Sequence, residues 1–233
     1  MRHSLFALTL TALAAGTALT AIPAVAAPVA APVAPAAATD DAALAKFFAD
    51  YDAAQLARSP MGKSYRGVID ADYGKWDDFS DAAEAQDYQA DQAALAEMHR
   101  RFDPARLSPE SRLSYRLFEK KVERAAGAYR YRDYGYVFDQ MNGAQSQLPA
   151  FLINIHRVTS KADAEAYVSR LQGLGNGMRQ AIAQSRARAD KGVMPPKWVY
   201  PYVISDAQNV VTGYPFTKSD VDAPLYADIK AKV

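Results

Sequence analysis

The stretch from Ser160 to Ile182, SKADAEAYVSRLQGLGNGMRQAI, decides the fold class of this chain. Its apolar residues recur at helical spacing and fall within an arc of roughly 120° on an α-helix. The residues of this stripe are Ala164, Tyr167, Val168, Leu171, Leu174, Met178 and Ile182. Ser160 and Asp163 form a start that resembles a capping box, with Asp163 in place of the usual Glu or Gln. The stretch predicts one long amphipathic helix.

Three glycines, Gly173, Gly175 and Gly177, lie inside this predicted helix. Their spacing resembles part of a dinucleotide-binding loop, but such a loop follows a strand and ends in a turn. Each glycine in a helix interior costs about 1 kcal/mol relative to alanine. Because Gly175 falls on the apolar stripe, we expect either close approach of a neighbouring backbone or a bend in the helix.

Similar signals predict further helices on both sides of this stretch. The expected starts are Asp40-Asp41, Ser80-Asp81, Ser108-Pro109-Glu110 and Thr217-Lys218-Ser219-Asp220, and a separate segment runs from Trp198 to Val211. Ser59-Pro60 and Asp103-Pro104 are expected to end helices, because a residue before proline is pushed out of the helical region. Strand-like alternation is scarce. The sequence therefore predicts an all-α fold, an antiparallel helical array joined by moderate loops.

The helix expected to start at Ser108 carries apolar residues on two sides. Phe118 and Val122 belong to one stripe, while Leu113 and Leu117 point nearly opposite. This pattern predicts a helix sandwiched between two neighbours.

The first residues are typical of an exported precursor. Arg2 and His3 precede an apolar run, and Ala24-Val25-Ala26 forms a small-residue cleavage site. We therefore expect a signal peptide over residues 1–26, an Ala/Pro-rich linker over 27–39 and a helical domain over 40–233. The alternative is an uncleaved membrane anchor. Without a cysteine to carry a lipid, the mature chain is expected to be periplasmic or secreted, with no stable membrane span after cleavage.

Charge and composition exclude some classes of function. Without Arg2, the remaining 26 cations balance 26 anions, so the mature chain has no excess charge for binding nucleic acid. No cysteine is present, which excludes disulfides and thiolate zinc ligands. Half of the chain is hydrophobic, enough to bury a core.

Gly62-Lys63-Ser64 resembles the end of a phosphate-binding loop. The first glycine of that motif is replaced by Ala57, and no strand is predicted before it. We therefore do not expect nucleotide binding there. Trp76-Asp77-Asp78 offers adjacent carboxylates, which more often mark the entry to a helix.

The histidines limit the metal chemistry. After removal of His3 only His99 and His156 remain, and neither belongs to the His-Glu-x-x-His pattern of a zinc helix. His99 and Asp103 have a suitable spacing, but Asp103 precedes a proline. No catalytic or metal-binding residue is therefore assigned, and His99 is expected to border the core.

Two segments remain open to a binding function. His156 follows the apolar run Phe151 to Ile155, so its imidazole either is buried and satisfied or faces a ligand. Asn142, Gln145 and His156 are the candidate substrate-binding residues, because this stretch mixes polar groups with a turn-forming glycine. From Tyr129 to Tyr136 tyrosines alternate with cations, a pattern typical of packed rings at a helix end or of a carbohydrate or peptide groove.

Several segments, taken in order, resemble the amino-terminal half of the bacterial family called domain of unknown function 885. They are Ser59-Pro60 with Ser64 and Gly67, Trp76-Asp77-Asp78-Phe79-Ser80, Tyr134 to Gly143 (YGYVFDQMNG), Ala166 to Leu171, and Lys191 to Pro196. The resemblance implies a longer, all-helical, zinc-peptidase-like protein. Its zinc would be held by a His-Glu-x-x-Pro-Gly-His motif in the carboxy-terminal half, and this chain contains no such motif.

Two functions follow as expectations. The first is an amino-terminal, non-catalytic helical portion of an exported zinc-metallopeptidase-like hydrolase, with peptide substrate bound by the complete protein and no cofactor in this chain. Asp228 to Val233 reads as an unfinished amphipathic helix, as expected for an incomplete portion of a larger fold. The alternative is a self-sufficient periplasmic helical module that binds a partner without enzymatic activity.

Overall fold

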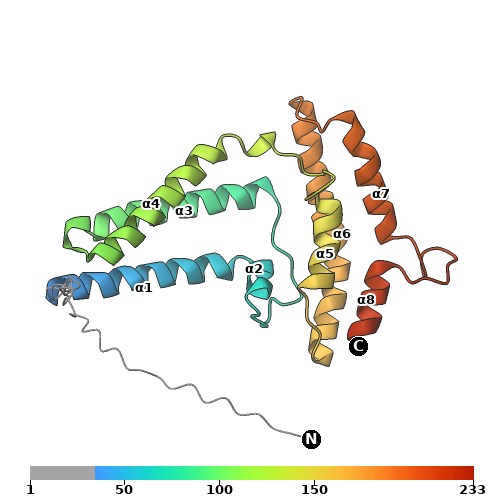
Figure 1. The fold of residues 1–233 in the computed structure, drawn as a ribbon, viewed down its shortest axis with the longest axis horizontal. Helices are drawn as coiled ribbons and strands as arrows, with labels where there is room; N and C mark the ends of the chain where they lie inside the picture. Colours follow the sequence, from blue (N-terminus) through green and yellow to red (C-terminus); the bar gives the residue numbers. More distant parts are fainter. Residues whose placement is uncertain (1–34) are drawn as a thin grey trace, which may run out of the picture. The chain divides into compact units, whose positions relative to one another are not determined.

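The computed structural model describes residues 35–233, with side chains from Thr39 onward (Figure 1). The predicted signal peptide and residues 27–34 of the predicted linker lie outside this part. The described residues are all-α: they form eight α-helices and no strand, apart from one isolated bridge between Tyr214 and Asp222. Within this range no helix combines the length and the hydropathy needed to cross a membrane.

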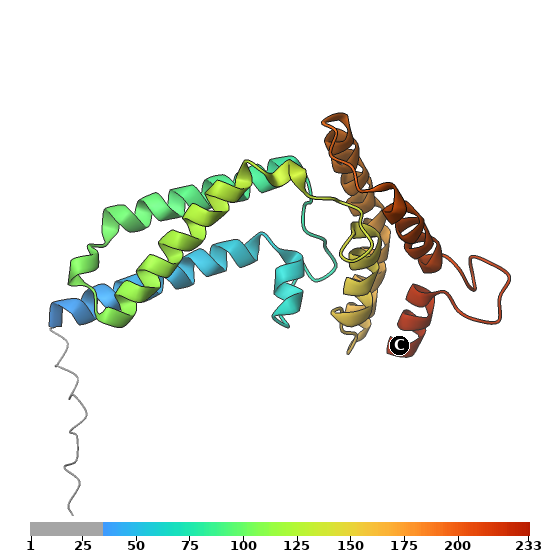
Figure 2. The same cartoon turned by 45° about the horizontal axis from the view of Figure 1, so that its top comes forward.

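The helices follow one another along the chain with loops and short 3₁₀ turns between them. Their bounds are α1 Pro35–Ala57, α2 Pro60–Tyr65, α3 Asp81–Arg101, α4 Pro109–Tyr129, α5 Ala144–Asn154, α6 Lys161–Asp190, α7 Tyr200–Val210 and α8 Pro224–Lys232. Figures 1 and 2 show that α1, α3 and α4 lie side by side, with α3 running opposite to α1 and α4 opposite to α3. The predicted all-α class is confirmed.

Three predicted helix starts are confirmed by their caps. The hydroxyls of Ser80, Ser108 and Ser160 each accept a hydrogen bond from the backbone N–H three residues later, which satisfies one of the free donors of a helix start. At Ser160 the second half of the capping box is displaced by one residue. The Asp163 carboxylate accepts chiefly from Thr159, with the Thr159 N–H at 2.9 Å.

The first core lies between α1, α3 and α4. Leu44 and Phe47 of α1 pack against Met98 of α3 and Phe118 of α4, and the rings of Phe47 and Phe118 meet edge to face with centroids 5.9 Å apart. The other side of α4 is largely open, since Leu113 is 56% exposed and Leu117 is 61% exposed. The expectation of a sandwiched helix is therefore wrong within this part of the chain.

The second core joins α5, α6 and α8. Leu152, Tyr167 and Leu225, one from each helix, form its buried centre. Polar contacts fix α8 in place. The Tyr167 hydroxyl donates to Asp228 at 2.8 Å, and the Lys232 ammonium donates to the Leu152 carbonyl at 2.9 Å, near the end of α5.

Four differences from the sequence expectations have local physical causes. Helix α1 begins at Pro35, so residues 35–39 of the expected linker are helical. Helix α2 is an addition to the expected helices. Ser59-Pro60 ends the helix before it, as expected, but Ser59 also caps α2 and Pro60 is its first residue. Helix α5 has no side-chain cap and contains Pro149. Helix α8 begins at Pro224, since Thr217 accepts from the Gly213 N–H in a turn.

Candidate functional site

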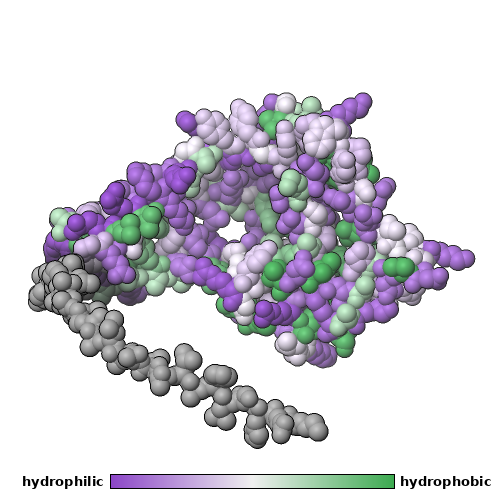
Figure 3. Space-filling view, in the orientation of Figure 1, coloured by the Kyte–Doolittle hydropathy of each residue, from purple (hydrophilic) through white to green (hydrophobic). Residues whose placement is uncertain are grey.

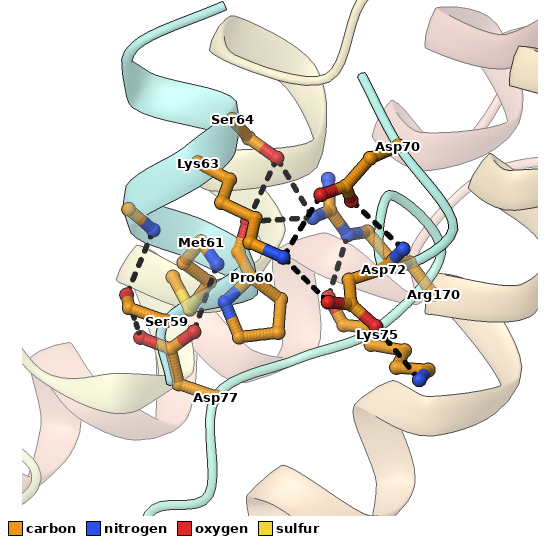
Figure 4. A network of polar contacts seen from close by, with 11 residues as sticks. Ser59, Pro60, Met61, Lys63, Ser64, Asp70, Asp72, Lys75, Asp77 and Arg170 are labelled. Atoms are coloured by element: carbon orange, nitrogen blue, oxygen red, sulfur yellow. Dashed lines mark hydrogen bonds and ion pairs between the residues drawn. The ribbon is translucent and has the colours of Figure 1, made fainter. Parts of the chain in front are cut away.

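A fully buried arginine, Arg170 of α6, lies at the centre of a polar cluster in this chain (Figure 4). Its Nε donates to the Lys75 carbonyl at 3.0 Å and its Nη2 donates to the Ser64 hydroxyl at 2.8 Å. Its Nη1 donates to Nδ1 of His156 at 2.9 Å. We call Arg170 with these three partners the Arg170 cluster. It joins α2, the loop before α3, the end of α5, and α6.

Aromatic rings replace the usual carboxylate partner of this buried cation. The guanidinium carbon lies 5.1 Å from the ring centroid of Tyr73 and 4.8 Å from that of Phe151. No described carboxylate forms an ion pair with Arg170. Burial lowers the pKa of Arg170 to about 10, so the side chain remains charged at neutral pH. Attraction to the electron-rich ring faces offsets part of the hydration energy that the guanidinium loses on burial.

The hydrogen bonds of His156 define its tautomer. Nε2 lies 3.0 Å from the Asp163 carbonyl, which can only accept, so Nε2 carries the proton. Nδ1 accepts from Arg170. Burial, with the positive charge of Arg170 as a smaller cause, lowers the pKa of His156 below its usual value. The imidazole is neutral, 1% exposed and engaged at both nitrogens.

The Gly62-Lys63-Ser64 segment lies in α2, and its polar groups are all engaged. The Lys63 ammonium pairs with Asp72 at 2.5 Å and with Asp70 at 2.9 Å. These contacts, with Lys75, lower the pKa of Asp72 to about 2. The Gly62 N–H donates to Ser59. These contacts give the segment a structural role at the start of the loop before α3.

The Trp76-Asp77-Asp78 segment packs against α2 and α6. The Trp76 indole N–H donates to the Arg170 carbonyl at 2.8 Å. Asp77 accepts from the Ser59 hydroxyl and from the Met61 N–H at the start of α2, whereas Asp78 accepts from the Ser80 N–H before α3. Asp77 therefore stabilises the start of α2, and Asp78 stabilises the start of α3.

Two of the three α6 glycines accommodate aromatic side chains. A Cβ at Gly173 would lie 2.8 Å from the Trp76 ring, and one at Gly177 would lie 3.2 Å from the Phe79 ring. The neighbours that come close are side chains, not the backbone that the sequence led us to expect. A Cβ at Gly175 would lie 3.6 Å from the Arg179 guanidinium.

An apolar groove of about 570 Å³ lies between α5, α6 and α7. We call it the α6 groove. The α6 side is formed by Leu171, Leu174, Gly175, Met178 and Ile182. The α7 side is formed by Val203, Ala207, Val210 and Val211, and Phe138, Gln145 and Pro149 complete the lining. In Figure 3 apolar side chains reach the surface over the part of the chain that contains α5 to α8. The predicted stripe of α6 is thus only partly covered.

The structure does not gather the three candidate substrate-binding residues at one site. Gln145 lines the α6 groove, is 3% exposed, and donates to the Asp139 carbonyl at 2.6 Å, while its Oε1 has no partner among the described residues. Asn142 lines a separate hollow near α2. His156 is buried in the Arg170 cluster. Their role in substrate binding stays a prediction.

The described side chains do not fit a zinc ion. The His99 Nε2 lies 3.0 Å from Glu119 of α4, and His156 has both nitrogens engaged. No group of three His, Cys, Asp or Glu side chains in the described range could hold a metal. We therefore derive no chemical step through zinc for these residues.

The tyrosine-rich segment packs partly on itself. Tyr129 stacks on Tyr88 with centroids 4.1 Å apart, and the Arg132 guanidinium lies 4.4 Å from the Tyr129 ring. Both ring faces of Tyr129 are thus occupied. Tyr134 remains 69% exposed.

Comparison with known families gives one match. The family described as bacterial protein of unknown function (DUF885) matches residues 60–233, from α2 to the end of α8. The chain belongs to this family. The Arg170 cluster and the α6 groove both lie within the DUF885 match. No curated protein and no solved structure matches the chain.

Two features of this DUF885 region were missed in the sequence. At helical pitch Arg170 lies about 40° from Leu174, just outside the apolar arc. An arginine so close to the apolar stripe is the sequence signal that could have indicated a buried cation. The α6 groove could not be anticipated, because periodicity shows which side is apolar and not whether another helix covers it.

Proposed function

We propose that this chain is the non-catalytic helical region of an exported, zinc-hydrolase-like DUF885 protein, and that the α6 groove forms one side of its peptide-binding cleft. The observation that supports the proposal is the groove itself. It is concave, almost wholly apolar and about 570 Å³ in volume, within the range of ligand sites.

The lining suits aliphatic side chains of a peptide. Leu174 and Met178 on one side and Val203 on the other offer dispersion contacts and an apolar surface that leaves water on binding. Because the groove is open, the peptide backbone can keep its N–H and C=O groups in water. Binding then needs few hydrogen bonds from the protein.

A charged substitution inside the groove tests this function. Leu174→Asp places a carboxylate among aliphatic side chains, so the affinity for an aliphatic peptide should fall at least tenfold in a calorimetric titration. Leu117→Asp, on the exposed side of α4, is the control, because Leu117 is 61% exposed outside the groove. Unchanged binding by the Leu174 variant would reject the groove as the site.

The absence of catalysis is tested separately. Because His99 and His156 are engaged by protein partners, the purified chain is expected to hold no stoichiometric zinc and to hydrolyse no peptide. Metal analysis and a peptide-cleavage assay check this. Turnover that disappears in His99→Ala or His156→Ala would contradict it.

The second candidate is a self-sufficient periplasmic binding module. The two packed cores favour it, because the buried centre of each is formed by the described helices alone. A monomer that melts cooperatively and binds no hydrophobic dye would support the module over the helical region of a larger hydrolase.

A further inference from the structure

The α6 side of the groove carries an unpaired guanidinium. Gly175 lines the groove, and Arg179 folds back so that its Nη1 would lie 3.6 Å from a Cβ at Gly175. Because Gly175 has no side chain, the guanidinium lies beside bare backbone at the groove's edge. Arg179 is exposed, and its side chain has no hydrogen bond or ion pair among the described residues.

A second arginine lies on the same face of α6. Arg186 follows Arg179 by seven residues, which places it within about 20° of the same direction and about 10 Å further along the axis. Its exposed side chain also has no described partner. The next cations are engaged, since Arg188 donates to the Gly135 carbonyl and Lys191 pairs with Asp133.

On the opposite side of the groove, no acid of α7 forms an ion pair with either arginine. The one acid of α7, Asp206, lies 3.4 Å from the Gln145 Nε2, which donates to it. Two arginines unpaired among the described residues therefore lie beside an aliphatic groove: Arg179 next to Gly175, and Arg186 one helical turn beyond Ile182, the last α6 residue of the lining.

We propose that the α6 groove binds an aliphatic peptide that carries two carboxylates, with its side chains in the groove and its carboxylates on Arg179 and Arg186. This inference rests on the proposed peptide-binding function and names the class of peptide. An extended peptide advances about 3.3 Å per residue, so carboxylates three residues apart match the spacing of the two arginines. A fatty acid has one carboxylate and would leave one arginine unpaired.

The test uses the full chain and two short probes. One is an acetylated tetrapeptide with an amino-terminal glutamate, three aliphatic residues and a free carboxyl end. The other has glutamine and a carboxamide in place of the two carboxylates. Two exposed charge pairs should make the first probe bind about five- to tenfold more tightly, and added salt should reduce the difference.

Variants test whether the difference in affinity between the two probes comes from Arg179 and Arg186. In Arg179→Gln/Arg186→Gln the two probes should bind equally. Arg124→Gln is the matched control, because Arg124 is an exposed arginine of α4 whose side chain has no described partner, and it should keep the full preference. All three substitutions lie on helix surfaces, and circular dichroism melts verify that each variant folds.

The outcomes separate this inference from the proposed function. Equal affinity of wild type for both probes would overturn the inference and leave the apolar peptide site intact. A preference that survives in the double variant would also overturn it. Failure of both probes to bind would reject the peptide site, and stronger binding of laurate than of either peptide would replace the peptide with a lipid.

Discussion

At the scale of single residues, Arg170 shows how a buried cation is held without a carboxylate. Four hydrogen-bond acceptors surround it, the fourth being the Pro60 carbonyl at 3.4 Å from Nη2, and two aromatic rings lie beside it. Such an arrangement is sensitive to loss of the cation, because Ser64 and His156 are buried acceptors that would then lose their donor. A smaller side chain in place of Arg170 would also leave a cavity between the rings of Tyr73 and Phe151.

Arg170→Met is expected to lower the free energy of unfolding by about 3 kcal/mol or more, since each unsatisfied buried acceptor costs about 1–3 kcal/mol. Urea denaturation measures the change. Arg170→Lys should be nearly as harmful, because one ammonium cannot reach the Lys75 carbonyl, Ser64 and His156 together. A loss below about 0.5 kcal/mol, as expected for Arg124→Gln, would show that the cluster contributes little.

His156 predicts a pH dependence of stability. Its folded-state pKa is lowered, chiefly by burial, so below about pH 6.5 the unfolded chain takes up a proton that the folded chain does not. The stability that is present above this pH should therefore fall as the solution is acidified toward the folded-state pKa. His156→Gln should flatten this decline, whereas His99→Gln should leave the contribution of His156 intact.

A direct measurement keeps this prediction testable if His156→Gln does not fold. The imidazole resonances of His156 in NMR spectra of the wild type should not titrate near pH 6.5. A normal titration curve for His156 would contradict the neutral, doubly bonded ring.

At the scale of elements, α6 has two different sides. One side carries Arg170, Gly173 and Gly177 against the loop before α3, and the other lines the groove. The sequence predicted this helix and its cap at Ser160 because both signals are local. It did not predict α2 or α5, since Ser59-Pro60 carries signals for both a stop and a start and α5 lacks a cap.

The glycines of α6 predict stability changes of opposite sign. Gly175→Ala meets only the far end of a flexible side chain and should stabilise by up to about 1 kcal/mol through helix propensity. Gly173→Ala would press on the Trp76 ring at 2.8 Å and should destabilise. Thermal melts of the two variants compare them. If Gly173→Ala also raises the melting temperature, the Trp76 ring moves aside without cost.

At the scale of the whole molecule, several apolar side chains remain exposed in the described part, and two of the surfaces they form bear on function. Leu113 and Leu117 on α4 form one, and the α6 groove forms the other. The sequence identified Leu113 and Leu117, which it assigned to a sandwiched helix, and the apolar stripe of α6, but not the α7 side of the groove. Coverage depends on contacts between distant segments, which a local pattern does not encode.

These surfaces predict binding of a hydrophobic dye by the folded chain. Leu113→Glu/Leu117→Glu should reduce the dye fluorescence, with little change in unfolding free energy because both side chains are already exposed. Fluorescence titration and a urea melt on the same sample measure both. Unchanged fluorescence in this variant and in Leu174→Asp would locate the dye elsewhere.

The contacts of Lys232 connect the end of α8 to the end of α5. Its ammonium donates to the carbonyls of Leu152 and Ile153, just before His156, and pairs with Asp228, which accepts from Tyr167. Any local opening of α8 therefore also frees the turn that positions the imidazole beside Arg170. Amide hydrogen exchange at the end of α5 and in α8 should thus proceed as one cooperative unit.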